Sequence, residues 1–107
     1  EISAEEVKQK LDGSDNITLV DVREPSEYDI CRIDGSTLIP LGKIEDMEPE
    51  NLTAISKSDQ IILHCKAGVR SLKAAKALKQ MGFNDVKSMA GGIEAWSEKI
   101  DPSIPKY

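Results

Sequence analysis

The sequence predicts an α/β fold in which a mostly parallel central sheet carries helices on both faces. Two short apolar runs, residues 17–22 and 61–65, are continuous rather than alternating, which is typical of strands buried on both faces of a parallel sheet. The second run ends in a loop that contains Gly68, and an amphipathic helix is predicted after it. This order of strand and helix favours parallel strands joined by helical crossovers.

A first helix is predicted ahead of the first strand. Ser3 followed three residues later by Glu6 is the pattern of a capping box, in which the serine side chain binds a free backbone N–H of the first turn. Val7 and Leu11 lie four residues apart and therefore on one face of this helix, and Gly13 is expected to end it.

A longer helix is predicted over residues 71–81. Its apolar residues recur every three to four positions, and Gly82 stands where a glycine commonly follows the last turn. This spacing predicts that Leu72, Ala75 and Leu78, together with Ala74, face the sheet. The opposite side of the helix carries Lys73, Lys76 and Lys79.

The remaining elements are expected to be shorter. Residues 86–89 fit a strand, and a last helix is expected through Ile93, Trp96 and Ile100. The helical spacing of these three residues indicates that Trp96 belongs to the core rather than to a binding platform. In the middle of the chain, the expected elements are a short strand at residues 38–39 and a short helix at residues 48–55.

The length of 107 residues fits a single domain, residues 1–107, which is large enough to bury a core. Hydrophobic residues make up 39% and charged residues 31%, as in globular proteins, so the chain is expected to fold. The chain does not begin with Met and shows no signal-peptide pattern, which leaves open that it is the C-terminal domain of a longer chain.

Charge and cysteine content exclude several classes of function. The net charge of -5 argues against a nucleic-acid surface, and the longest apolar runs are far shorter than the roughly 20 residues that cross a bilayer. Two cysteines, Cys31 and Cys65, are too few for a disulfide framework and favour a reducing compartment, so a cytoplasmic protein is expected. No Cys and His residues have the spacing of a set of metal ligands, and no glycine-rich motif of the kind that binds nucleotides is present. Neither a metal nor a cofactor is therefore expected.

The strongest functional signal is Cys65, at the carboxyl end of the second predicted strand. Sites in parallel α/β sheets lie at such ends, where loops run into helix N-termini. The backbone N–H groups after Cys65 cannot all bond inside the helix that follows, so a curled loop can direct them at one anionic centre. Gly68 permits the positive φ that this curling needs. The predicted cradle around a nucleophilic Cys65 consists of Lys66, Ala67, Gly68, Val69, Arg70 and Ser71.

Arg70 is expected to add positive charge close to Cys65. Together with the helix N-terminus, it is predicted to lower the pKa of the thiol below the free value of about 8.5. Its guanidinium also offers a planar fork to an oxyanion such as the sulfonate end of thiosulfate. Ser71 is expected to cap the helix or close the loop with its hydroxyl. The alternative for Cys65 is a buried structural thiol.

The spacing between Cys65 and Arg70 discriminates between two chemistries. Four residues separate them, whereas cysteine phosphatases have five and so form a cradle wide enough for a phosphoryl group. The smaller ring favours a terminal sulfur atom held above Cys65 over a tetrahedral phosphate.

Two residues at the end of the first strand are candidates for support of the site. Asp21 is predicted either to stiffen the active loop by accepting backbone N–H bonds or to cap a turn. Arg23 is expected to pair at the surface with Glu24, Glu27 or Asp21, where such pairs contribute little, or to contact the substrate.

Three more residues have competing interpretations. Cys31 is expected to be a buried structural thiol, with a resolving or disulfide-forming role toward Cys65 as the alternative. His64 precedes Cys65 on a strand, so it points to the opposite face and is expected in the core rather than as a base. Lys66 either adds positive potential at the mouth of the loop or is simply solvated.

Several segments together resemble the rhodanese family in order and spacing. They are residues 21–25 (DVREP), Gly35-Ser36 ahead of Ile39-Pro40-Leu41, residues 64–71, and Gly91-Gly92-Ile93 with Trp96. Residues 30–33 and 105–107 more narrowly resemble the rhodanese domain fused behind the adenylyltransferases of molybdopterin and thiamine biosynthesis. Many rhodaneses have Gly-His-Ile-Pro-Gly where this chain has Cys31-Arg32-Ile33-Asp34-Gly35, at a position that is usually structural.

The resemblance implies a sulfurtransferase in which Cys65 carries sulfur as a persulfide, taken from thiosulfate or from the persulfide of a cysteine desulfurase. In the fused subfamily the acceptor is the adenylated C-terminus of a ubiquitin-like sulfur carrier, which implies such a carrier and a fused adenylyltransferase domain as partners. Two other hypotheses stay open. One is a non-catalytic interaction module of the same fold, and the other is a cysteine phosphatase or arsenate reductase.

Overall fold

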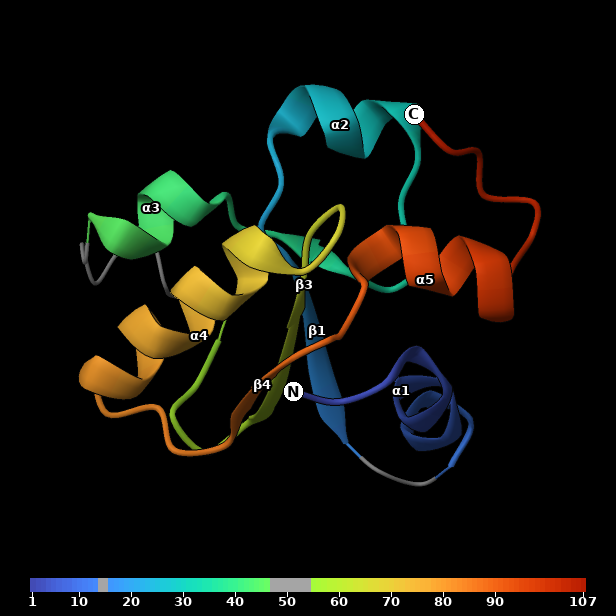
Figure 1. Ribbon diagram of the computed structural model, residues 1–107. Coiled ribbons are helices and arrows are strands. Elements are labelled where there is room, and N and C mark those ends of the chain that lie inside the picture. The colour runs from blue at the N-terminus through green and yellow to red at the C-terminus, as the bar shows by residue number, and fades with distance from the viewer. Residues whose placement is uncertain (14–15, 47–54) are drawn as a thin grey trace.

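The computed structural model describes residues 1–13, 16–46 and 55–107. Within them the chain forms helices and strands in alternation (Figure 1). The helices are α1 (Ala4–Asp12), α2 (Pro25–Ile30), α3 (Leu41–Glu45), α4 (Val69–Gln80) and α5 (Gly92–Lys99). The strands are β1 (Ile17–Asp21), β2 (Thr37–Leu38), β3 (Gln60–His64) and β4 (Val86–Ser88).

The four strands form one parallel sheet in the order β2-β1-β3-β4. The register of the central pair places Asp21 of β1 beside His64 of β3 at the carboxyl ends of both strands. Helices α3 and α4 cover one face of the sheet and α1 and α5 the other, whereas α2 lies beyond the carboxyl ends of the strands (Figure 1). The predicted α/β fold, with a parallel sheet and helices on both faces, is confirmed.

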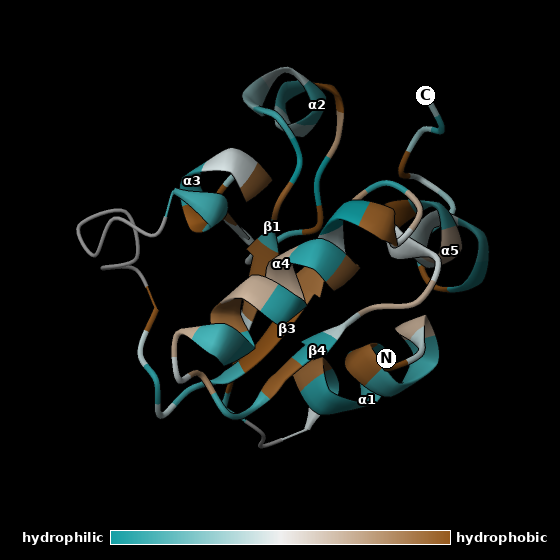
Figure 2. Cartoon of the chain, turned by 60° about the vertical axis from the view of Figure 1, so that its left-hand side comes forward, coloured by the Kyte–Doolittle hydropathy of each residue, from teal (hydrophilic) through white to brown (hydrophobic). Residues whose placement is uncertain are grey.

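Alternate residues of the two central strands enter two separate cores. Val20 and Leu63 belong to the cluster on the α3 and α4 side, whereas Leu19 and Ile62 belong to the cluster on the α1 and α5 side. All four are buried. This two-sided burial explains why both strand sequences are apolar without alternation. In Figure 2 the apolar, brown β3 lies behind helices that carry hydrophilic, teal residues.

Helix α1 begins as predicted, but its last turn differs from the prediction. The Ser3 side chain caps the helix by accepting a hydrogen bond from the backbone N–H of Glu6, and Val7 is fully buried. Leu11, which was expected to share this burial, is 39% exposed. It lies in the last turn of α1 and lines a surface cavity, so the described residues cover its side chain only in part.

Helix α4 begins at Val69 rather than at residue 71, and its buried face is rotated from the predicted one. Leu72 is 47% exposed, so the prediction that it faces the sheet is wrong. The buried residues are Ser71, Ala74, Ala75 and Leu78. Three small side chains on this face let the helix lie close to the sheet, and this arrangement turns Leu72 toward solvent.

Two further predictions concern the middle of the chain. The strand expected at residues 38–39 is β2, Thr37–Leu38. The helix expected at residues 48–55 lies outside the described part of the chain, except for its last residue, Ile55. Among the helices described, none is long and apolar enough to cross a membrane.

Candidate active site

Cys65 directly follows β3 and lies at the carboxyl end of the sheet. It is 1% exposed and packs in the core cluster beneath α4. Gly68, immediately before α4, has a φ of +108°, a left-handed conformation that residues with a Cβ rarely adopt. The positive φ curls the loop, so that its backbone N–H groups turn back toward the sulfur of Cys65.

The sulfur of Cys65 is surrounded by hydrogen-bonding groups. The backbone N–H of Gly68 donates to Sγ over 3.1 Å, and Ser71 Oγ lies 3.6 Å from Sγ. The backbone N–H groups of Ala67 and Ser71 also bond to the sulfur. Burial raises the pKa of the Cys65 thiol, but the hydrogen bonds from the Ser71 hydroxyl and these three N–H groups outweigh it and hold the pKa below its ordinary value.

A glycine at the start of α5 supports the loop from outside. A Cβ at Gly92 would come within 2.4 Å of the Cys65 carbonyl oxygen, so only glycine allows α5 to approach this closely. The backbone N–H groups of Ile93 and Glu94 then donate to the carbonyls of Cys65 and Lys66, over 2.8 and 3.1 Å. The first turn of α5 thereby fixes the backbone from which the Cys65 loop departs.

Arg70 is held by Glu27, which the sequence suggested only as a partner of Arg23. Its two terminal nitrogens donate to both carboxylate oxygens of Glu27 in α2, over 2.5 and 2.9 Å. The hydrogen bond from Arg70 is the main cause that lowers the pKa of Glu27 to about 2. The positive charge of Arg70 also interacts with Cys65. The guanidinium nonetheless makes no hydrogen bond to the sulfur within the described residues.

Tyr107 lies beside Arg70 and Glu27 through its hydrogen bond to Glu27, and it was not predicted from the sequence as a site residue. Its hydroxyl donates to Glu27 Oε2 over 2.7 Å and accepts a hydrogen bond from Arg23 Nη1 over 2.9 Å. The ammonium of Lys66 lies 4.6 Å from the centre of the Tyr107 ring. The one signal in the sequence was the resemblance of residues 105–107 to the fused rhodanese domains.

Asp21 and Arg23 form a buried ion pair, so the expectation of a surface pair for Arg23 is wrong. Both residues are 0% exposed, and Arg23 Nη2 donates to Asp21 Oδ2 over 2.7 Å. The backbone N–H of Arg23 donates to the same carboxylate, and Nη2 also donates to the Cys31 carbonyl over 2.6 Å. Within the described residues, the hydrogen bonds of the Asp21 carboxylate come from Arg23 and not from the Cys65 loop. The pair therefore shapes the connection between β1 and α2.

His64 and Cys31 are both buried, as expected. Burial lowers the pKa of His64 to about 4, and neither ring nitrogen has a hydrogen-bond partner within the described residues. A neutral imidazole in the core is poorly suited to act as the base for Cys65. The Cys31 thiol lies 3.6 Å from the Pro105 carbonyl oxygen, and both cysteines are free thiols.

The other residues of the predicted cradle form its rim. Val69 is 65% exposed, and Ala67 is exposed as well. Of these two, Ala67 bonds to the sulfur, through its backbone N–H. Lys66 is partly buried, with its ammonium 4.0 Å from the Glu94 carboxylate. Of the residues predicted for the cradle, Ala67, Gly68 and Ser71 bond to the Cys65 sulfur, whereas Arg70 and Lys66 pair with Glu27 and Glu94.

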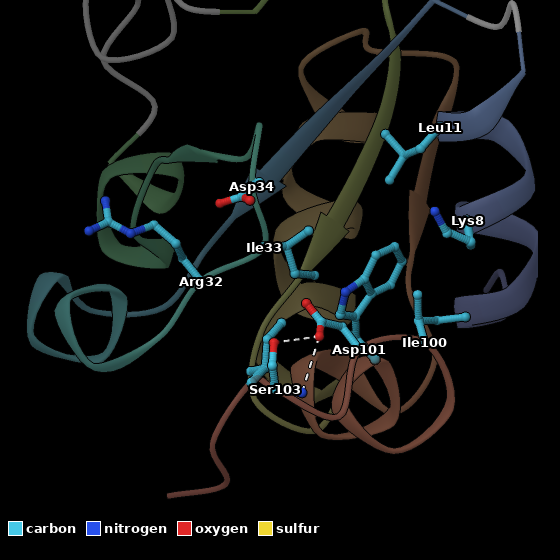
Figure 3. Close-up of a pocket in the computed structure, with 10 residues that line it drawn as sticks. Lys8, Leu11, Arg32, Ile33, Asp34, Ile100, Asp101 and Ser103 are labelled. Atoms are coloured by element: carbon cyan, nitrogen blue, oxygen red, sulfur yellow. Dashed lines mark hydrogen bonds between the residues drawn. The ribbon is translucent and has the colours of Figure 1, made fainter.

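A separate cavity of about 480 Å³ lies between α1, α5 and the segment after α2 (Figure 3). Leu11, Ile33 and Ile100 contribute to its lining, and no residue of the Cys65 loop does. Arg32, at its edge, points away from the other side chains drawn (Figure 3). The cavity therefore lies apart from the candidate site. Within the described residues, no group of three or more His, Cys, Asp or Glu side chains is arranged to hold a metal ion.

Residues 3–99 match the rhodanese-like domain family. The chain is 39% identical over 106 residues to the probable adenylyltransferase/sulfurtransferase MoeZ of Mycobacterium tuberculosis, across 99% of this chain and 26% of MoeZ. It is 36% identical over 124 residues to the adenylyltransferase and sulfurtransferase MOCS3 of Danio rerio, across 99% of this chain and 27% of MOCS3. The chain thus spans about a quarter of the length of these relatives.

Solved structures show the same architecture. A rhodanese-like domain protein from Staphylococcus aureus superposes with a TM-score of 0.78 at 35% identity, across 89% of this chain and 88% of that chain. The human single-domain sulfurtransferase TSTD1 superposes with a TM-score of 0.81 at 27% identity, across 92% of this chain and 95% of that chain. By sequence and by fold, the chain belongs to the rhodanese-like domain family.

Proposed function

We propose that this chain is a sulfurtransferase in which Cys65 carries sulfur as a persulfide. The Cys65 thiolate attacks the outer, sulfane sulfur of a donor such as thiosulfate, the S–S bond of the donor breaks, and sulfite leaves with the electron pair of that bond. An acceptor nucleophile then attacks the outer sulfur of the persulfide, and the Cys65 thiolate is released. Each step exchanges one sulfur bond for another, so no external oxidant or reductant is needed.

The observation that carries the proposal is the ring of donors around Cys65 Sγ. Three backbone N–H groups and the Ser71 hydroxyl favour the charged sulfur in a buried site. The same groups can bind the terminal sulfur anion of a persulfide, because that atom takes over the negative charge one bond further out. The four-residue spacing from Cys65 to Arg70 supports this small anion over a phosphoryl group.

For the acceptor, the relatives suggest a protein. MoeZ and MOCS3 are named as adenylyltransferases and sulfurtransferases, and this chain matches about a quarter of each. We therefore propose that residues 1–107 act as one sulfur-donating domain toward the adenylated C-terminus of a ubiquitin-like sulfur carrier. A cysteine desulfurase persulfide is the alternative donor to thiosulfate. A reducing, cytoplasmic setting would keep the Cys65 thiol available.

Two measurements test the core of the proposal. After incubation with thiosulfate, mass spectrometry of the intact chain and of its Cys65 peptide is expected to show one added sulfur atom, and cyanide is expected to remove it as thiocyanate. Cys65→Ser is expected to abolish both results, whereas the matched variant Cys31→Ser is expected to keep them. No added sulfur on Cys65 would favour the interaction module, and hydrolysis of an aryl phosphate faster than sulfur transfer would favour the phosphatase.

A further inference from the structure

Ser88, which no motif singled out, lies directly behind the Cys65 site. It is the last residue of β4 and pairs in register with Leu63 of β3. The residue is 2% exposed, and its Oγ lies 2.6 Å from Ser71 Oγ. Within the described residues, this is the one hydrogen bond of the Ser88 side chain.

The contacts of the Ser71 hydroxyl decide which serine is the donor. Ser71 Oγ lies 3.6 Å from Cys65 Sγ, 3.2 Å from the Gly68 carbonyl oxygen and 2.6 Å from Ser88 Oγ. A hydroxyl donates one proton and accepts two, and a carbonyl can only accept. All three contacts are satisfied together when Ser71 donates to Gly68 and accepts from both the Cys65 thiol and Ser88.

The reverse direction would be unfavourable. If Ser71 donated to Ser88, the Ser88 proton would lack a partner within the described residues, in a buried position where an unmade hydrogen bond is costly. The Gly68 carbonyl would also lose its bond from Ser71. The contacts therefore identify Ser88 as the donor.

We propose that Ser88 is a positioning residue of the Cys65 site: its hydroxyl donates to Ser71 Oγ and thereby leaves the Ser71 proton free to bind the charged sulfur. When Cys65 releases its proton to solvent, the Ser71 hydroxyl turns from the Gly68 carbonyl to Sγ. The bond from Ser88 polarises that hydroxyl and strengthens the new, charge-assisted bond. The consequence for sulfur transfer rests on the proposed function, because the thiolate is the form that attacks the donor.

The test is the pH dependence of Cys65 alkylation by iodoacetamide, measured on the Cys65 peptide so that Cys31 does not contribute. At pH values below the midpoint of the parent curve, Ser88→Ala is expected to react roughly twofold to tenfold more slowly, as the loss of one hydrogen bond implies. The midpoint is expected to move to higher pH, and the limiting rate at high pH is expected to stay the same. The matched control Ser97→Ala removes a buried hydroxyl that donates to Ile104, and it is expected to leave the midpoint unchanged.

A second pair of variants keeps the shape of the side chain constant. Ser88→Thr retains the hydroxyl and Ser88→Val lacks it, and both are suited to a strand, so a shift in Ser88→Val alone supports the proposal. In the Ser71→Ala background, Ser88→Ala is expected to cause no further shift, because Ser88 acts through Ser71.

The proposal would be overturned by an unchanged midpoint in Ser88→Ala, by equal midpoints for Ser88→Thr and Ser88→Val, or by additive shifts in the double variant. An equal loss of rate at every pH would indicate a purely structural role and would overturn it too. Arg70, the charged residue that interacts with Cys65, and its partner Glu27 are the same in all these variants. The readout needs no sulfur transfer, so a failure of Cys65 to accept sulfur would refute the proposed function without affecting the midpoint.

Discussion

Gly68 determines how the backbone of the candidate site is folded. Its φ of +108° turns the loop so that its own N–H reaches Cys65 Sγ, and a side chain at this position would be strained. Gly68→Ala is therefore expected to lower the free energy of unfolding by roughly 1–2 kcal/mol and to abolish sulfur transfer. Urea unfolding and a thiosulfate assay measure the two effects.

A second glycine provides the control for Gly68→Ala. Gly42 lies in α3, and a Cβ there would meet no atom of the described residues within 4 Å. Gly42→Ala is expected to raise the free energy of unfolding by up to about 1 kcal/mol, because alanine favours the helix, and to leave activity unchanged. Equal behaviour of the two variants would contradict the role assigned to the loop conformation.

Glu27 limits the charge that Arg70 presents to an anionic donor. Because the pKa of Glu27 is lowered to about 2 by its bond with Arg70, its carboxylate neutralises Arg70 at neutral pH. Glu27→Gln is expected to lower the KM for thiosulfate, since Arg70 then keeps an uncompensated charge close to Cys65. The matched variant Glu98→Gln, whose carboxylate pairs with Lys106 at the surface, is expected to leave the KM unchanged. A higher KM in Glu27→Gln would show that Arg70 needs its partner in order to bind the donor.

The same pair predicts a pH dependence of stability. The folded pKa of Glu27, about 2, lies below the unfolded value of about 4.3. The pair therefore stabilises the fold fully above the unfolded value, and this contribution is lost as the pH falls through 4 toward 2. The parent is expected to exceed Glu27→Gln by about 1 kcal/mol at pH 7, and the difference is expected to be mostly lost at pH 2, where the folded Glu27 carboxylate is half protonated. Urea unfolding at both pH values measures it, and a difference as large at pH 2 as at pH 7 would contradict the assignment.

At the scale of elements, helix α4 shows what a hydrophobic period can and cannot predict. The three-to-four spacing correctly indicates a helix, and Leu78 lies on its buried face. The period does not fix the exact rotation of the helix about its axis. Here Ala74 and Ala75 pack on the sheet as expected, but Ser71 is buried in place of Leu72. Leu72 remains half exposed because the helix approaches the sheet on those alanines.

This rotation of α4 predicts a contrast between two leucines. Leu78→Ala is expected to lower the free energy of unfolding by about 2–5 kcal/mol, because it leaves a cavity in the core. Leu72→Ala is expected to change it by less than about 0.5 kcal/mol, since the side chain is largely solvated. Urea unfolding of both variants measures the contrast, and a similar loss in both would show that Leu72 is buried after all.

At the scale of the whole molecule, the predictable part of the site is the part that is local in sequence. Cys65, Gly68 and Ser71 lie within one loop, and their roles follow from a strand end, a glycine and a helix start. Glu27 and Tyr107 are 80 residues apart, so no periodicity or spacing relates them. The burial of Arg23 escaped prediction for the same reason, because one of its partners is Tyr107, which lies 84 residues away.

Tyr107 connects the far end of the chain to the α2 side of the site. Its hydroxyl bridges Glu27 and Arg23, while its ring contacts Lys66 in the Cys65 loop. Tyr107→Phe keeps the ring contact and removes both hydrogen bonds, one of them to a buried arginine. We therefore expect it to lower the free energy of unfolding by about 1–3 kcal/mol.

The experiment compares Tyr107→Phe with Tyr28→Phe by urea unfolding at pH 7. Within the described residues, the Tyr28 hydroxyl makes one hydrogen bond, over 3.2 Å to the neutral Ser36 carbonyl, and phenylalanine keeps the ring that contacts Arg32, so the loss is expected to be smaller. Because Tyr107 also fixes Glu27, the KM for thiosulfate is expected to shift in Tyr107→Phe in the same direction as in Glu27→Gln, whereas Tyr28→Phe leaves it unchanged. A stability loss in Tyr107→Phe without any change in KM would confine Tyr107 to holding the end of the chain in place.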